Sequence, residues 1–134
     1  MPAVHIKVIA VIVAALINMG LGALWYSPWL FGAAWAKSIG KKLEDLRSPS
    51  PAYMFMLLAA LFQAYVVAHV IYSVLDFTAL DGARTGLWLA LGLVVPVTGG
   101  ITLFEGRNWR WFAIVSGYYI LSLMTTGALL AAWV

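Results

Sequence analysis

The residues Trp25-Tyr26-Ser27-Pro28-Trp29-Leu30-Phe31-Gly32, which follow an apolar run from Val4 to Leu24, decide the fold of this chain. An apolar run of about 20 residues is long enough to cross the hydrocarbon core of a bilayer as a helix. Pro28 lacks a backbone N–H and restricts the residue before it, so the first helix is expected to end there. The tryptophans and the tyrosine are amphipathic aromatic residues, which gather at the membrane–water boundary. The stretch therefore predicts a transmembrane helix end at the membrane surface.

The composition of the whole chain is that of a membrane protein. Of its 134 residues, 64% are hydrophobic and 10% are charged, and the mean hydropathy is +0.96. Soluble domains carry about 25% charged residues, and a soluble domain of this size could not bury so much apolar surface. The lipid bilayer is therefore the expected partner of most of the surface. The absence of cysteine excludes disulfides and thiolate chemistry, and a net charge of +3 is too small to indicate nucleic-acid binding.

Four apolar segments are long enough to cross a membrane, at about residues 4–24, 53–75, 83–104 and 109–134. Because these runs are continuous rather than alternating, helices are expected and not the strands of a barrel. The charge beside the first segment lies mainly on its C-terminal side, and no small-residue cleavage site of a signal peptide precedes Trp25, so the segment is expected to remain in the protein. We predict an all-α polytopic membrane protein. Residues 1–134 form a single integral membrane domain, with four transmembrane helices in a bundle and an interfacial aromatic segment after the first helix.

The basic residues predict the orientation of these spans. Six of the eight lie in the loops after the first and third spans: Lys37, Lys41, Lys42, Arg47, Arg107 and Arg110. Only Lys7 and Arg84 belong to the opposite side. The positive-inside rule then makes residues 25–52 a cytoplasmic loop and places both termini on the extracytoplasmic side.

The start of that loop carries the candidate interfacial anchors. They are the aromatic residues Trp25, Tyr26, Trp29, Phe31 and Trp35. We expect this part of the loop to lie along the membrane surface, with its aromatic side chains at the depth of the lipid headgroups.

Polar side chains inside the spans are the candidates for a binding site, because an unused polar group in lipid is unfavourable. No Asp, Glu, Lys or Arg lies near the centre of a span, which argues against proton-coupled export by an intramembrane carboxylate. One face of the second span carries four polar residues at helical spacing: Tyr65, His69, Tyr72 and Asp76. They could line a polar path in which His69 binds a solute or relays a proton towards Asp76. Alternatively, His69 is neutral and hydrogen-bonded to a tyrosine or a backbone carbonyl of a neighbouring span, and Asp76 is a solvated loop residue. A single histidine without a second ligand predicts no metal site, and no cofactor or catalytic residue is indicated.

Rows of small residues predict close contacts between helices. The first span carries such a row at Ala10, Ala14, Asn18 and Gly22, and the third span carries another at Gly82, Gly86 and Ala90. We expect Asn18 to hydrogen-bond across its contact; the alternative is a ligand contact on the path with His69 and Tyr65. Pro96, followed by Gly99 and Gly100, is expected to kink or loosen the third helix.

Several of these motifs occur together in a known order: Asn18, Gly22, Trp25–Pro28, Phe31–Gly32, Trp35, Ala64–Tyr65, Asp81–Gly82, Phe104–Arg107, Gly117–Tyr119 and Trp133. In this order and over nearly the whole chain, the sequence resembles the domain of unknown function 1761 family. The resemblance implies a small bacterial four-helix membrane protein, for which we expect the inner (plasma) membrane. It implies no activity, substrate or catalytic residue.

Three functions remain to be compared. The small-residue rows, the aromatic residues and the uncharged spans favour a structural or accessory membrane component, either a homo-oligomer or a subunit of a larger complex. The alternative is a small-solute transporter or channel, oligomeric, with a polar path around His69, Tyr65 and Asn18. An enzyme is not expected, because acid–base catalysis needs positioned pairs of groups and His69 has no such partner in the sequence.

Overall fold

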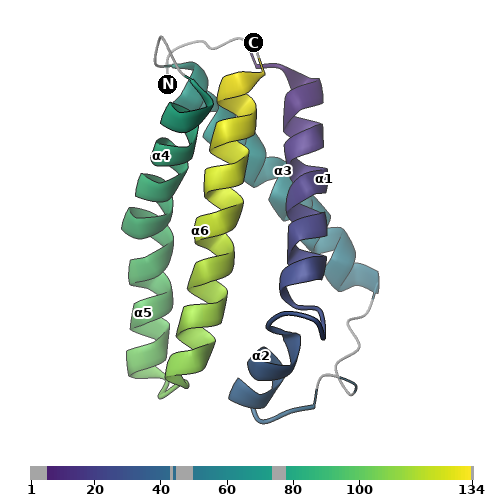
Figure 1. Ribbon diagram of the computed structural model, residues 1–134, viewed down its shortest axis with the longest axis vertical. Helices are drawn as coiled ribbons and strands as arrows, with labels where there is room; N and C mark the ends of the chain where they lie inside the picture. The colour runs from purple at the N-terminus through teal and green to yellow at the C-terminus, as the bar shows by residue number, and fades with distance from the viewer. Residues whose placement is uncertain (1–5, 43, 45–49, 74–77, 134) are drawn as a thin grey trace.

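The computed structural model describes residues 6–42, 44, 50–73 and 78–133 of the chain (Figure 1). This part of the protein is mainly helical and contains no strand. In chain order the elements are α1 (Val8–Trp25), α2 (Gly32–Ser38), α3 (Ser50–Tyr72), α4 (Ala79–Leu89), the π-helix η2 (Ala90–Val94), α5 (Val95–Phe104) and α6 (Trp109–Ala132). Four helical stretches are long and apolar enough to span a membrane: α1, α3, the continuous α4–η2–α5 and α6. The predicted all-α fold with four spans is confirmed.

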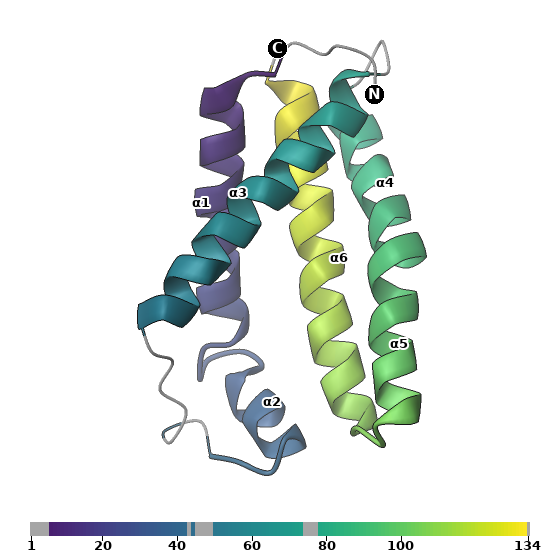
Figure 2. The same cartoon turned by 180° about the vertical axis from the view of Figure 1, so that it is seen from behind.

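The central element of the bundle is α6, which packs against α1, α3 and α4 and also contacts α2. In Figure 1, α1 lies on one side of α6 and α4–α5 on the other, and both run antiparallel to it. The remaining span, α3, crosses α1 and α6 obliquely (Figure 2). The start of α1 and the end of α6 therefore lie at one end of the bundle, and α2 lies at the other end with the turn between α5 and α6.

The predicted spans differ from the observed helices mainly at their ends. The second span begins at Ser50 rather than at residue 53 and its helix ends at Tyr72. The third begins at Ala79 rather than at residue 83. The fourth begins at the predicted Trp109 and its helix ends at Ala132. Hydropathy places the middle of a span well but places its polar ends poorly, because the first turn of a helix can be polar.

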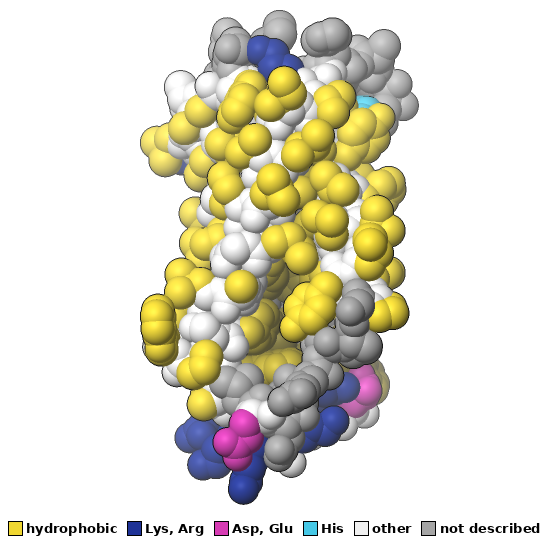
Figure 3. Space-filling model, turned by 90° about the vertical axis from the view of Figure 1, so that its right-hand side faces the viewer, with side chains coloured by type: hydrophobic (Ala, Val, Ile, Leu, Met, Phe, Trp, Pro, Cys, Tyr) yellow, Lys and Arg dark blue, Asp and Glu magenta, His cyan; other side chains and the backbone are white. Residues whose placement is uncertain are grey.

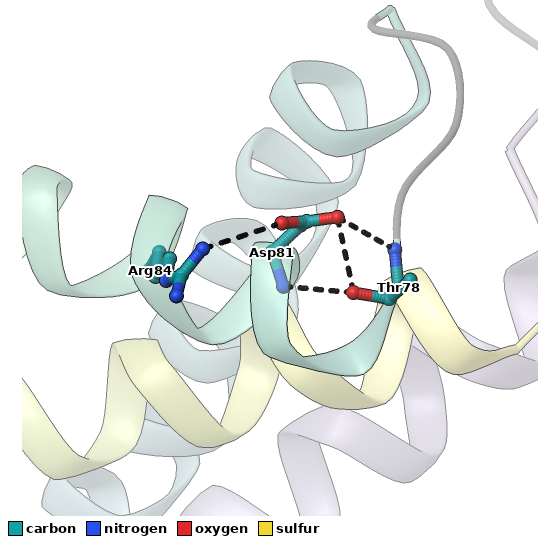
Figure 4. Close-up of polar contacts among 3 residues, drawn as sticks. All are labelled: Thr78, Asp81 and Arg84. Carbon is teal, nitrogen blue, oxygen red and sulfur yellow. Dashed lines mark hydrogen bonds and ion pairs between the residues drawn. The ribbon is translucent and has the colours of Figure 1, made fainter.

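The start of α4 shows why (Figure 4). Thr78 is the N-cap, and its Oγ1 accepts a hydrogen bond from the Asp81 backbone N–H at 3.2 Å. In return, the Thr78 backbone N–H donates to Asp81 Oδ2 at 3.2 Å. This reciprocal pair is a capping box, and the carboxylate also suits the positive end of the helix dipole. Arg84 Nη1 lies 3.9 Å from Asp81 Oδ1 in the next turn. The polar residues before the predicted span are therefore its first helical turn.

The contact between α4 and α6 is made by glycine backbones. A Cβ atom at Gly82 would overlap the carbonyl oxygen of Gly127, and a Cβ at Gly86 would overlap that of Leu123. Helix axes come this close only where no side chain separates them. The next residue of the row, Ala90, is completely buried. The packing row predicted on the third span is confirmed.

Buried alanines of α1 and α3 join residues of α6 in one core cluster. The buried cluster includes two alanines from each helix: Ala10, Ala14, Ala64 and Ala68. All four have almost no exposed surface. Small side chains let the two helices pack closely even though they cross obliquely, and the row predicted on the first span is confirmed as a packing face.

The third span widens at η2 instead of breaking. Pro96 lies in the first turn of α5, immediately after the π-helix, where its missing N–H is tolerated. The hydroxyl of Thr98 lies 3.1 Å from the carbonyl oxygens of both Val94 and Val95 and donates to them. The third helix is thus loosened immediately before Pro96, whereas Gly99 and Gly100, which were expected to contribute, lie within the regular helix α5.

The glycine contact between α4 and α6 can be tested by adding one methyl group. We expect Gly86→Ala to lower the free energy of unfolding by about 1–3 kcal/mol, because its Cβ cannot fit against the Leu123 carbonyl. The matched control is Gly92→Ala on the same span, where a Cβ would meet no atom within 4 Å. Thermal unfolding in detergent, followed by circular dichroism, measures both. Equal stability of Gly86→Ala and the wild type would contradict the close backbone contact.

Candidate functional site between α1 and α6

Asn18 is the polar residue at the centre of the contact between α1 and α6. Its side chain is buried, with the residue only 2% exposed, and its Nδ2 donates to Thr126 Oγ1 at 2.7 Å. Its backbone carbonyl accepts a hydrogen bond from the Tyr118 hydroxyl at 2.9 Å. The interhelical hydrogen bond expected of Asn18 is therefore present. Its other side-chain atom, Oδ1, is buried and has no protein partner in the described part of the chain.

Gly22, one turn after Asn18, makes room for this arrangement. A Cβ at Gly22 would lie 3.1 Å from the Tyr118 hydroxyl oxygen. A larger side chain at this position would therefore push away the hydroxyl that reaches the Asn18 carbonyl. The spacing Asn18-x-x-x-Gly22 thus has a structural reason: one residue binds α6, and the other lets the tyrosine of α6 approach.

Trp25, at the end of α1, makes the second polar contact with α6. Its indole Nε1 donates to the backbone carbonyl of Ile114 at 3.0 Å. Its ring lies over Gly117, where a Cβ would be 3.1 Å from the nearest ring carbon. Gly117 therefore accommodates the indole ring, and Trp25 fixes the last turn of α1 against α6.

The chain then turns sharply into α2. The backbone N–H groups of Phe31 and Gly32 donate to the carbonyls of Trp25 and Ser27, each at 3.0 Å. A Cβ at Gly32 would overlap the carbonyl oxygen of Tyr26, so this turn requires glycine. The segment predicted to lie along the membrane surface is therefore a compact turn followed by a short helix that contacts α6.

An aromatic cluster fills the space between this turn and α6. The ring of Tyr26 lies 5.2 Å from that of Trp35 and 5.7 Å from that of Tyr118, measured between centroids. Burial raises the pKa of the Tyr26 hydroxyl, and the neighbouring Tyr119 and Tyr118 raise it further. Tyr26 is thus a neutral side chain at physiological pH.

The five predicted anchors therefore fall into two groups. Trp25, Tyr26 and Trp35 are half-buried. Trp29 is 88% exposed and Phe31 is 40% exposed, although Phe31 also contacts the Trp25 ring at 4.5 Å between centroids. The first group connects α1 and α2 to α6. For Trp29 and Phe31, a position among the headgroups stays a prediction.

A further polar contact joins α5 to α6. Thr98 Oγ1 lies 2.7 Å from Ser116 Oγ, and both side chains are buried. Together with the Asn18–Thr126 pair, this contact means that α6 is hydrogen-bonded to a helix on each side of it.

The other residues of the predicted polar path lie apart from this site. Tyr65 is 46% exposed on α3, and His69 is half-buried with Nδ1 3.0 Å from the Tyr65 carbonyl oxygen. The histidine thus bonds to its own helix, not to a neighbouring one. The Tyr72 hydroxyl is buried without a partner among the described residues, and Asp76 lies outside them. No hydrogen bond joins Asn18 to the described members of the path. The polar path therefore stays a prediction. In the same part of the chain, no three His, Cys, Asp or Glu residues gather as metal ligands.

The sequence pointed to Asn18 but not to its partners on α6. Tyr118, Ser122 and Thr126 are spaced by four residues, as are Asn18 and Gly22, and all three are buried. Such a polar row on one face of an apolar helix could have identified a packing face of α6, although not the helix that packs against it.

Four apolar helices, held together by small residues and interhelical hydrogen bonds, define a multi-pass α-helical membrane protein. The chain belongs to the family of proteins of unknown function DUF1761, which matches residues 9–131 and was expected from the sequence motifs. Searches of the curated proteins and of the solved structures found no match to this chain.

The different roles of two tryptophans in one motif can be tested directly. We expect Trp25→Phe to lower the free energy of unfolding by about 1–2 kcal/mol, since the phenyl ring cannot donate to the Ile114 carbonyl. Trp29→Phe makes the same chemical change at an exposed position and is expected to have little effect. Thermal unfolding in detergent compares the two variants. A larger loss of stability in Trp29→Phe would contradict the assigned roles.

Proposed function

We propose that the protein is a structural component of the membrane without catalytic activity, which self-associates or joins a larger complex. The observation that supports this proposal is that buried polar side chains hydrogen-bond to one another across helix contacts. Asn18 bonds to Thr126, and Thr98 bonds to Ser116, in each case across a helix contact. A transport path or an active site needs polar groups that are available to a ligand, whereas the Asn18 Nδ2 group and the hydroxyls of these two pairs are used between helices.

Two glycines on the third span support self-association. A Cβ at Gly92 or Gly100 would meet no atom within 4 Å, in contrast to Gly82 and Gly86. A glycine within a helix is less favourable than alanine by about 1 kcal/mol, so packing within one chain gives no reason for these two. With Pro96 between them, they form a row of residues spaced by four, which we call the outer row. Such rows let membrane helices of separate chains approach closely.

The outer row can be tested by making it bulky. We expect Gly92→Leu combined with Gly100→Leu to weaken association about tenfold or more, which is about 1.4 kcal/mol. Energy transfer between donor- and acceptor-labelled copies in liposomes, at several protein-to-lipid ratios, measures association. Gly20→Leu is the matched control, because a Cβ at Gly20 on α1 also meets no atom within 4 Å.

Two results would contradict this proposal. The first is a wild type that is monomeric at every protein-to-lipid ratio and that purifies alone from native membranes. The second is a solute flux in liposomes that is lost in His69→Ala, which would favour the transporter alternative. If Gly20→Leu weakened association as much as the double variant does, the outer row would be excluded as the site of association.

We further propose a bacterial inner membrane as the location, with the α2 end in the cytoplasm and both termini outside. The basic side chains support this orientation. Five of them lie at the end that holds α2 and the α5–α6 turn, and we call this surface the basic end: Lys37, Lys41, Lys42, Arg107 and Arg110. Figure 3 shows Lys and Arg side chains gathered at that end, with acidic side chains among them, below a largely hydrophobic surface. At the opposite end the described basic residues are Lys7 and Arg84.

Reporter fusions test this orientation. Alkaline phosphatase fused after the last residue is expected to be active, and green fluorescent protein at the same position is expected to be dark, because the positive-inside rule puts the C-terminus outside. Fusions truncated after Gly106, in the turn between α5 and α6, should show the opposite pattern. A fluorescent C-terminal fusion would contradict the proposed orientation.

A further inference from the structure

In the described part of the chain, the basic end carries more basic than acidic side chains. All five of its basic residues are exposed, and the described acidic residues near them are Glu44 and Glu105. Glu105 Oε1 lies 3.9 Å from Arg107 Nη2. Within the described ranges, Lys37, Lys41, Lys42 and Arg110 form no ion pair. An excess of positive charge therefore faces outward at one end of the bundle.

Two turns of the same type hold these charges in place. After α2, Gly40 has φ of 75°, and the Lys41 N–H donates to the Ala36 carbonyl at 2.9 Å. After α5, Gly106 has φ of 64°, and the Arg107 N–H donates to the Thr102 carbonyl at 3.0 Å. Both are helix ends of the Schellman type, which favour glycine in the left-handed conformation. Each turn thus places a basic residue directly after its glycine on an ordered backbone.

Large apolar side chains are exposed beside these charges. Phe104, the last residue of α5, is 95% exposed, and Trp109, the first residue of α6, is 72% exposed. The Trp109 ring stacks on Phe112 with centroids 5.2 Å apart, and the Arg107 guanidinium lies 4.7 Å from the centre of the Trp111 ring. Aromatic rings next to lysine and arginine at the end of a membrane span match the boundary between acyl chains and headgroups.

We propose that the basic end binds the headgroups of anionic phospholipids. The phosphate oxygens would accept hydrogen bonds from the ammonium and guanidinium groups, and Trp109 and Trp29 would lie beside the upper part of the acyl chains. Figure 3 shows hydrophobic side chains lining a hollow on the face of α1 and α3, above the basic end. This binding depends on charge complementarity at one end of a single chain, and it is independent of self-association along the outer row.

The experiment compares two lipids that differ in charge. The protein is reconstituted in phosphatidylcholine vesicles that contain brominated phosphatidylglycerol or brominated phosphatidylcholine, and quenching of tryptophan fluorescence reports binding. We expect stronger quenching by the anionic lipid. Near an anionic surface each Lys or Arg is worth roughly a fivefold change in affinity. Lys41→Gln with Lys42→Gln should therefore lower the preference for the anionic lipid by roughly tenfold or more.

Matched variants keep the test specific. Arg107→Gln with Arg110→Gln removes the same charge at the second turn and is expected to lower the preference similarly. Lys7→Gln with Arg84→Gln removes the same charge at the opposite end and should leave the preference unchanged. Thermal unfolding of each variant shows that it is folded. Trp29→Phe should reduce the total quenching, because it removes one of the tryptophans placed beside the acyl chains.

Three outcomes would overturn the proposal: equal quenching by the two lipids in the wild type, an equal loss in Lys7→Gln with Arg84→Gln, or displacement of the anionic lipid by inorganic phosphate at constant ionic strength. The last outcome would identify a site for free phosphate. Weakening of the preference as sodium chloride is raised is the expected result for exposed charges.

Discussion

Lipid tails are as apolar as leucine side chains, so burial of apolar surface does little to hold membrane helices together, and close approach and interhelical hydrogen bonds decide their arrangement. In this protein both act on α6. On one side, Gly127 lies against Gly82 with no side chain between the backbones. On the other side, Thr126 and Tyr118 bond to Asn18. These contacts, together with the Trp25–Ile114 and Thr98–Ser116 hydrogen bonds, fix α1 and the third span relative to α6.

The family motifs describe one connected structure rather than separate features. Asn18, Gly22 and Trp25 belong to the first helix, and their partners, Tyr118 and Gly117, belong to the last. Each glycine makes room for an aromatic side chain of the other helix. The pattern that identifies the family is therefore the pattern of a helix–helix contact, which explains how it can be recognised without indicating a reaction.

Length and hydropathy were sufficient to predict the four spans, because an unbroken apolar run can cross a bilayer only as a helix. Small-residue spacing also predicted the packing faces at Gly82 and Gly86. The partners of Asn18 and Trp25 were beyond prediction, since they lie 108 and 89 residues away and local periodicity contains no information on which helices meet. The aromatic segment after α1 was predicted as interfacial from composition alone. Its folding onto α6 depends on Tyr118 and Gly117, which that segment does not contain.

The π-helix η2 gives the third span two different faces. A π turn holds a hydrogen bond over one residue more than an α turn, and each residue of an α-helix turns the chain by about 100°. The widening at Ala90–Val94 therefore changes the phase of everything that follows. Gly82 and Gly86 before it point to α6, whereas a Cβ at Gly100, which an unbroken α-helix would place near the same face, meets no atom within 4 Å. Deleting a single residue from η2 would rotate the following half of the span about its axis. The side chains that this half exposes to lipid or to another protein therefore depend on the length of one helical turn.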